Sequence, residues 1–134
     1  MTIVNKRILV MDDEENIRKI AGRMLKHIGY SDVEFAYDGA EAVAMYAKAR
    51  DAGSPFDIVI MDIVIAGGVG GKEAIQWLLQ VDPEARVIVS SGSRYDSTLL
   101  NYKQHGFMAA LPKPYTIEDL SVVLGKVFNS IPSR

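Results

Sequence analysis

The chain has 134 residues, of which 49% are hydrophobic and 24% charged, and this size and balance suit one globular domain with its own core. The net charge of −2 and the pI of about 5.6 argue against a nucleic-acid surface, because binding to phosphate backbones needs clustered Lys and Arg. Without cysteine the chain has no disulfide framework and no thiolate metal site.

Membrane segments are not expected either. The first residues lack a long apolar run after their charges, so they do not form a signal peptide, and no apolar stretch of about eighteen residues is present to span a bilayer. We therefore expect a cytoplasmic protein without membrane insertion and without a nucleic-acid partner.

Short apolar runs alternate along the chain with longer amphipathic segments, which is typical of βα units around a parallel sheet. Strands are predicted at 7–11, 33–37, 58–61, 87–90 and 107–111. One helix is predicted after each strand; the fourth, at about 96–105, has the weakest pattern. The sequence thus predicts an α/β protein with five strands and five helices, one domain over 1–134, a core of about 6–128 and a frayed tail at 129–134.

Apolar spacing also predicts which side of each helix is buried. Gly29 and Gly106 are expected to end helices, and Thr116 with Asp119 to form a capping box. Trp77 lies beside a predicted buried face, so its burial stays open. The predicted buried stripes are Ile17, Ile20, Met24 and Ile28; Ala40, Val43, Ala44 and Ala47; Ala74, Ile75, Leu78 and Leu79; and Ile117, Leu120, Leu124, Val127 and Phe128.

Three carboxylates follow apolar runs that are predicted to be strands. Asp12 and Asp13 come after 7–11, and Asp62 comes after 58–61. If these strands are parallel neighbours, the three acids meet outside the carboxyl end of the sheet, where open α/β sheets bind ligands. Like charges this close raise one another's pKa or require a cation. Carboxylates, waters and a phosphate are the usual ligands of Mg²⁺, so the sequence indicates Mg²⁺ and a phosphoryl group.

Two other phosphate-handling motifs do not fit. The segment 66–73 is close to a P-loop, but Ala66 stands at the first glycine and Glu73 replaces the Ser or Thr that a P-loop needs for its metal. A haloacid-dehalogenase-type phosphatase would need a second aspartate two positions after Asp62, where this chain has Val64. Neither activity is expected.

Four elements in order give the chain its family resemblance. They are the acid pair Asp12-Asp13, Asp62 after the third strand, Ser91 after the fourth, and Lys113-Pro114 after the fifth. Over about 6–128 the chain resembles the receiver domain of two-component response regulators. The resemblance implies a flavodoxin-like, doubly wound parallel sheet with strand order 2-1-3-4-5, which places the fifth strand at an edge.

The resemblance also implies a reaction. Asp62 would be the phosphoacceptor and would take a phosphoryl group from a phosphohistidine of a histidine kinase or a histidine phosphotransfer protein. Mg²⁺ would be held by Asp12, Asp13, Asp62 and the backbone carbonyl of Val64. Such a receiver catalyses only its own phosphorylation and dephosphorylation, so a turnover enzyme is not expected.

Two further side chains have implied roles beside the acids. Lys113 would bring a compact positive charge to the phosphoryl oxygens, and a cis bond to Pro114 would turn this lysine back toward Asp62. Ser91 would donate its hydroxyl to the phosphoryl group. Ser90 is its rival, but alternation along the strand would turn Ser90 to the other face.

The chain departs from the family at several positions. Ala66 replaces a usual proline, and the glycines within 65–71 predict a mobile loop. Ala110 stands where receivers carry an aromatic switch residue, so the usual coupling of hydroxyl to ring is in doubt. The glycine-rich segment looks more like receivers attached to hybrid histidine kinases than like those of transcription factors. The chain is either an independent receiver or part of a longer kinase or regulator. The alternative function is a pseudo-receiver that binds proteins without phosphorylation, although such modules typically lose an acid, the acceptor or the lysine.

Overall fold

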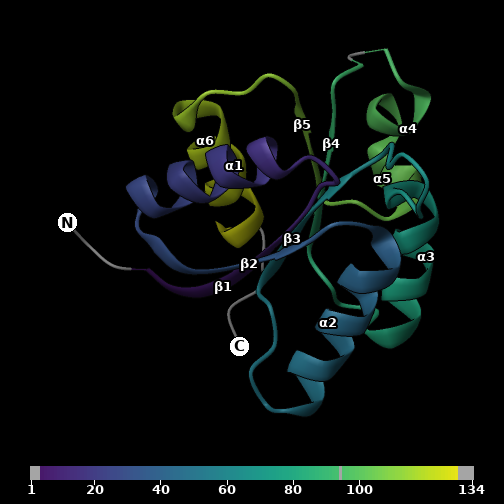
Figure 1. Cartoon of the computed structure of the whole chain (residues 1–134), viewed down its shortest axis with the longest axis horizontal. Coiled ribbons are helices and arrows are strands. Elements are labelled where there is room, and N and C mark those ends of the chain that lie inside the picture. Colours follow the sequence, from purple (N-terminus) through teal and green to yellow (C-terminus); the bar gives the residue numbers. More distant parts are fainter. Residues whose placement is uncertain (1–3, 94, 130–134) are drawn as a thin grey trace.

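The computed structural model describes residues 4–93 and 95–129 (Figure 1). Within them, five strands and six helices alternate along the chain. The strands are β1 (Val4–Met11), β2 (Tyr30–Ala36), β3 (Ile58–Asp62), β4 (Val87–Ser91) and β5 (Ala109–Pro112). The helices are α1 (Glu15–Ile28), α2 (Gly39–Asp51), α3 (Gly71–Val81), α4 (Ser97–Leu100), α5 (Tyr102–His105) and α6 (Ile117–Asn129).

All five strands are parallel and lie in the order β2-β1-β3-β4-β5. Helices α1 and α6 cover one face of the sheet, and α2 to α5 cover the other (Figure 1). The predicted fold class and strand order are therefore confirmed, with β5 at an edge. The prediction of one domain over 1–134 stays a prediction; of its frayed tail, Asn129 is the last residue of α6, and 130–134 lie outside the described residues.

Alternate side chains of the inner strands enter two separate cores, because successive residues of a strand point to opposite faces. Ile8 and Val10 of β1 join the core under α1 and α6, whereas Leu9 and Met11 join the core under α2 and α3. Every residue of β3 and β4 is buried. Burial on both faces explains why these strands are uniformly apolar up to their last residues.

The fourth predicted helix is not one helix in the structure. It divides at Asn101 into α4 and α5, each of four residues. Asn101 has φ −111° and ψ 38°, and its side-chain amide donates to the carbonyl of Ser97. Ser, Thr and Asn side chains compete for backbone hydrogen bonds and weaken helices, which accounts for the break. β5 then begins at Ala109, two residues after the predicted start.

Two predicted helix stripes are also shifted. In α1 the fully buried side chains are Ala21 and Leu25, while Ile20 is 47% exposed. In α2, Ala42 and Tyr46 are buried and the predicted Ala40 and Ala44 are exposed. The stripes of α3 and α6 are confirmed at Ala74, Ile75 and Leu78 and at Leu120, Leu124 and Val127.

The predicted helix ends and the capping box are present. Gly29 and Gly106 follow α1 and α5 with positive φ values of 126° and 102°, which glycine adopts without strain. The hydroxyl of Thr116 accepts from the backbone N–H of Asp119, and the Asp119 carboxylate accepts from the N–H of Thr116. Trp77 is 43% exposed, which settles the question of its burial.

The end of the glycine-rich segment 65–71 packs tightly against its neighbours, whereas Ala66, Gly67 and Gly68 are exposed. A Cβ on Gly70 would lie 2.0 Å from the carbonyl oxygen of Ile63, and one on Gly71 would lie 2.9 Å from the carbonyl oxygen of Asp62. The backbone N–H of Gly39 donates to the carbonyl of Val69 over 2.7 Å. Gly70 and Gly71 thus permit close packing of the backbone, and the mobility of the loop stays a prediction.

Candidate functional site

The three acids lie together at the carboxyl end of the sheet. β1 and β3 are parallel neighbours in a register that pairs Met11 with Met61, so Asp12 and Asp62 follow these residues side by side. One carboxylate oxygen from each of Asp12, Asp13 and Asp62 lies within 4.8 Å of the other two. Asp12 and Asp62 are buried, with exposed fractions of 3% and 8%. Two buried carboxylates this close to each other demand a positive charge nearby.

Lys113 supplies that charge from the end of β5. Its Nζ lies 2.5 Å from Oδ2 of Asp12 and 3.0 Å from Oδ2 of Asp62. Burial lowers the pKa of the Lys113 ammonium, but its hydrogen bonds and ion pairs with the two carboxylates outweigh this effect and raise the pKa. The peptide bond from Lys113 to Pro114 is cis, as predicted.

Asp62 has the opposite balance of effects. Burial is the largest influence and raises the pKa of its carboxyl, Lys113 lowers it, and the negative charge of Asp12 raises it again. The net pKa lies above the ordinary value in spite of the lysine. Three carboxylates lie together with the single ammonium of Lys113, so the site holds more negative charge than one ammonium neutralises, which favours an additional cation.

The loops that follow β1 and β3 are tied to each other through the acids. The backbone N–H of Val64 donates to Oδ1 of Asp62, and the N–H of Ala66 donates to Oδ2 of Asp13, both over 3.3 Å. The Val64 side chain is 66% exposed, so only its backbone is directed to the site. The three carboxylates offer oxygen atoms, which are the ligands that Mg²⁺ prefers.

The two serines at the end of β4 face different surroundings. The Ser90 hydroxyl donates to the carbonyl of Leu111 over 2.8 Å inside the core. The Ser91 hydroxyl accepts from the backbone N–H of Ser93. Ser90 is therefore occupied between two strands, whereas Ser91 belongs to the loop end of β4. Gly92 has no atom within 4 Å of the position where a Cβ would stand.

Sequence reasoning missed one cation at the site. Nη1 of Arg18 donates to the backbone carbonyl of Asp12 over 2.7 Å, and thus ties the first turn of α1 to the loop that carries two of the acids. The signal in the sequence is weak, because an arginine six residues after an acid is usual on any amphipathic helix.

An apolar hollow lies directly beside the site. It has a volume of about 450 Å³ and is lined by Ile17, Ile20 and Met24 of α1 together with Gly92, Lys113, Pro114 and Tyr115. Burial raises the pKa of the Tyr115 phenol. The isoleucines that were expected in the core thus form a surface next to the acids.

The sequence matches the family model described as the response regulator receiver domain over residues 8–124. The chain belongs to this family. Curated relatives of the receiver domain include the chemotaxis protein CheY of Thermotoga maritima, 28% identical over 124 residues that make up 92% of this chain and 98% of CheY. The transcription factor SKN7 of Saccharomyces cerevisiae is 32% identical over 87% of this chain, which spans only 18% of SKN7.

Solved structures have the same architecture. A response regulator receiver domain protein from Clostridium thermocellum has a TM-score of 0.81 and 25% identity, with 93% of this chain and 95% of that chain covered. The CheY in a CheX–CheY–BeF3–Mg complex from Borrelia burgdorferi has a TM-score of 0.83 at 24% identity, with coverage of 92% and 89%. At this identity the second likeness shows the fold alone.

The receiver domain carries an acidic pocket that can bind a metal, formed by Asp12, Asp13 and Asp62. Among the described helices, none combines the length and the apolar character that crossing a membrane requires.

Proposed function

We propose that this receiver domain takes a phosphoryl group from a phosphohistidine onto Asp62 in a reaction that requires Mg²⁺. The observation that carries the proposal is the arrangement at the end of the sheet: three carboxylate oxygens within 4.8 Å of one another and the Lys113 ammonium on two of them. This set can hold a divalent cation and a phosphoryl group at the same time.

Each side chain has a defined task in the transfer. A carboxylate oxygen of Asp62 attacks the phosphorus, the new P–O bond forms, and the P–N bond breaks to leave the donor imidazole. The Asp12, Asp13 and Asp62 carboxylates and the Val64 carbonyl would hold Mg²⁺, which would supply positive charge to the phosphoryl oxygens. Lys113 exchanges its ion pair with Asp62 for one with a phosphoryl oxygen, and the Ser91 hydroxyl donates to another.

The donor is a histidine kinase or a histidine phosphotransfer protein that docks beside the acids. The apolar hollow formed by α1 and the segment 113–115 supports a protein donor. Ile20 is 47% exposed and lines it together with the half-buried Ile17 and Met24, and such an apolar surface is costly to leave in water next to a polar site. The domain acts as a cytoplasmic signalling module that catalyses only its own phosphorylation and dephosphorylation. This chain covers 98% of one relative and 18% of another. Receivers of this family thus occur both alone and within longer proteins, and the domain works in the same way alone or within a hybrid kinase or a regulator with an output domain.

Incubation with acetyl phosphate and Mg²⁺, followed by intact mass spectrometry, tests the proposal. We expect the mass of one added phosphoryl group on the wild type, none on Asp62→Asn, and an unchanged adduct on Asp51→Asn, a matched change at an exposed acid of α2. EDTA should abolish the adduct. Labelling that EDTA does not diminish would refute the metal, and a wild type without adduct would leave the alternative of a pseudo-receiver that binds proteins independently of phosphorylation.

A further inference from the structure

The outer edge of β2 is open. β2 is the first strand in the order β2-β1-β3-β4-β5, so within the described residues it pairs with β1 on one side and with no strand on the other. An open edge presents a row of backbone N–H and C=O groups that can pair with another chain. Two hollows flank this edge, one on each face of the sheet.

The hollow on the α1 side is basic with an apolar floor. Three cations of α1, Lys19, Arg23 and Lys26, stand over Val33 and Phe35 of β2, and the volume is about 290 Å³. Lys19 pairs with Glu15 over 3.3 Å on the exposed surface. Within the described part of the chain Arg23 and Lys26 have no carboxylate within ion-pair distance. Two of the three positive charges are thus available to a partner.

Gly22 gives this hollow its floor. A Cβ at Gly22 would lie 2.8 Å from Cζ of Phe35, so a side chain at this position would require the aromatic ring to move away from the helix. A glycine within a helix costs about 1 kcal/mol relative to alanine, yet the ring remains 38% exposed. The Phe35 ring therefore remains accessible to a partner beside the open edge of β2, because α1 does not cover it completely.

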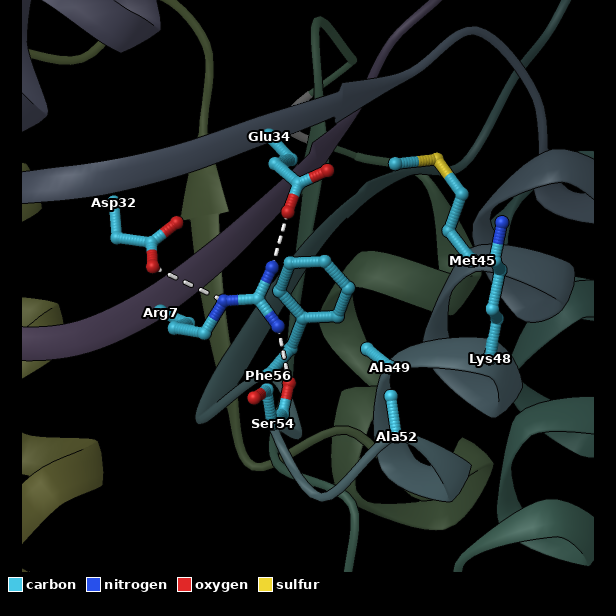
Figure 2. A pocket seen from close by; sticks show the side chains of 9 residues that line it. All are labelled: Arg7, Asp32, Glu34, Met45, Lys48, Ala49, Ala52, Ser54 and Phe56. Carbon is cyan, nitrogen blue, oxygen red and sulfur yellow. Dashed lines mark hydrogen bonds and ion pairs between the residues drawn. The ribbon is translucent and has the colours of Figure 1, made fainter.

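The hollow on the α2 side is close to neutral (Figure 2). The Arg7 guanidinium binds the carboxylates of Asp32 and Glu34, and its carbon lies 4.3 Å from the ring centroid of Phe56. Arg7 also donates to the carbonyl of Ser54. Lys48 contributes a second cation, so the two cations Arg7 and Lys48 balance the two carboxylates. The remaining wall is mainly aliphatic and aromatic. The volume is about 620 Å³, with walls formed in addition by Met45, Ala49 and Ala52.

We propose that the open edge of β2 binds an extended segment of a partner protein, in which acidic and apolar residues alternate. The segment pairs with the β2 backbone as an added strand, and alternation directs its side chains to the two faces in turn. Acidic side chains meet Lys19, Arg23 and Lys26, and apolar side chains meet the neutral hollow beside Phe56. The three cations cover about 10 Å of helix, which matches about three residues of extended chain. This surface is separate from the acids and does not depend on phosphorylation.

Two other occupants fit less well. A second copy of β2 would bring its own Asp32 and Glu34 to the same face as those already present, and like charges across paired strands are destabilising. A nucleic acid would find only three cations on a short stretch, with the carboxylates of Asp32 and Glu34 on the same strand, and affinity for phosphate backbones grows with the number of neutralised phosphates.

The test uses the full chain and a capped heptapeptide that alternates Glu and Val. We expect amide chemical-shift changes in residues 30–36 and at Gly22 on titration. The variant Lys19→Glu/Arg23→Glu/Lys26→Glu should bind the peptide about tenfold or more weakly, because charge complementarity is reversed. The matched control Lys72→Glu/Lys103→Glu/Lys126→Glu changes the net charge by the same amount, at exposed cations outside both hollows. It should bind the peptide like the wild type.

Each of four outcomes would overturn the proposal. One is equal binding of the peptide by the variant at 19, 23 and 26 and by the control variant, both shown to be folded by circular dichroism. Another is equal binding by a peptide that is N-methylated at alternate residues, because methylation removes strand pairing and leaves the charges intact. The third is binding of a ten-nucleotide oligothymidylate at least as tight as that of the acidic peptide, and the fourth is concentration-dependent dimers in sedimentation that the peptide does not dissociate.

Discussion

Two adjacent serines show how the strand alternation divides tasks between neighbours. The Ser90 hydroxyl is buried and joins β4 to β5 through the carbonyl of Leu111. The Ser91 hydroxyl lies at the loop and accepts only from a backbone N–H two residues later. The first contact contributes to stability, and the second leaves the Ser91 proton available to a ligand.

Substitution of each serine should therefore affect a different measurement. Ser90→Ala leaves the Leu111 carbonyl without its donor, and we expect a loss of about 1 kcal/mol in the free energy of unfolding with an unchanged rate of labelling by acetyl phosphate. Ser91→Ala should slow labelling and leave the free energy of unfolding within about 0.5 kcal/mol of the wild type. Urea denaturation and intact mass measure the two quantities. If labelling were slower for Ser90→Ala and not for Ser91→Ala, Ser90 and not Ser91 would be the residue that assists phosphorylation.

The raised pKa of Asp62 predicts a dependence of stability on pH. A carboxyl whose folded pKa exceeds its unfolded value of about 3.9 makes the fold most stable below that value, and this stability is lost as pH rises through the folded pKa. In EDTA at pH 7, Asp62→Asn should thus have a higher free energy of unfolding than the wild type. The difference should shrink as the pH is lowered toward 4.

Urea denaturation between pH 4 and pH 8 checks this expectation. The exposed change Asp51→Asn is the control and should follow the wild type within about 0.5 kcal/mol. A wild type more stable than Asp62→Asn at pH 7 would mean that the ion pair with Lys113 outweighs the cost of burial.

At the scale of elements, the connection between β3 and α3 is constrained at its α3 end. Gly70 and Gly71 lie against the backbone of 62–63, and the Val69 carbonyl accepts from Gly39 in the first turn of α2. Gly70→Ala would place a methyl carbon 2.0 Å from a carbonyl oxygen, and overpacking of this kind costs about 1–3 kcal/mol. Gly92→Ala is the control, because its Cβ meets no atom within 4 Å. Equal unfolding free energies of the two variants in urea would contradict this packing.

The elements also show where sequence patterns stop being informative. The periodic spacing predicted helices well, but in α1 it did not distinguish a core stripe from an exposed one, because Ile17 and Ile20 follow the same 3.6-residue period as Leu25. The break at Asn101 depends on a side-chain hydrogen bond that spacing does not reveal. For the site, strand ends predicted the meeting of Asp12 and Asp62, whereas the contact from Arg18 depends on how far a long side chain reaches in the folded chain.

Across the whole molecule, Lys113 joins the site to the edge strand β5. Ala110 of β5 carries only a methyl group, which cannot change its packing as an aromatic ring would when the site is phosphorylated. A ligand shifts an equilibrium only through contacts that differ between two states. Phosphorylation should therefore bias mainly the loops 65–71 and 92–98, of which residue 94 lies outside the described residues, with little repacking of β5.

Hydrogen exchange with and without a beryllofluoride mimic and Mg²⁺ measures this response. We expect slower exchange in the two loops and less than a twofold rate change along 107–111, with Asp62→Asn unaffected. Large changes along 107–111 together with dimers that form on addition of the mimic would show that β5 transmits the signal.

The packing of segment 65–71 has a consequence for how the chain tolerates insertions. Glycine-rich surface loops usually accept extra residues at little cost, since loop closure entropy grows slowly with length. Here the carbonyl of Val69 accepts a hydrogen bond from Gly39 and the backbone of Gly70 lies against that of Ile63, so the end of the segment that leads into α3 is fixed. Gly53, in the connection from α2 to β3, has open space around it, as does Gly67. Inserted sequence, such as a peptide tag or a fluorescent label, belongs at one of these two positions and not between Val69 and Gly71.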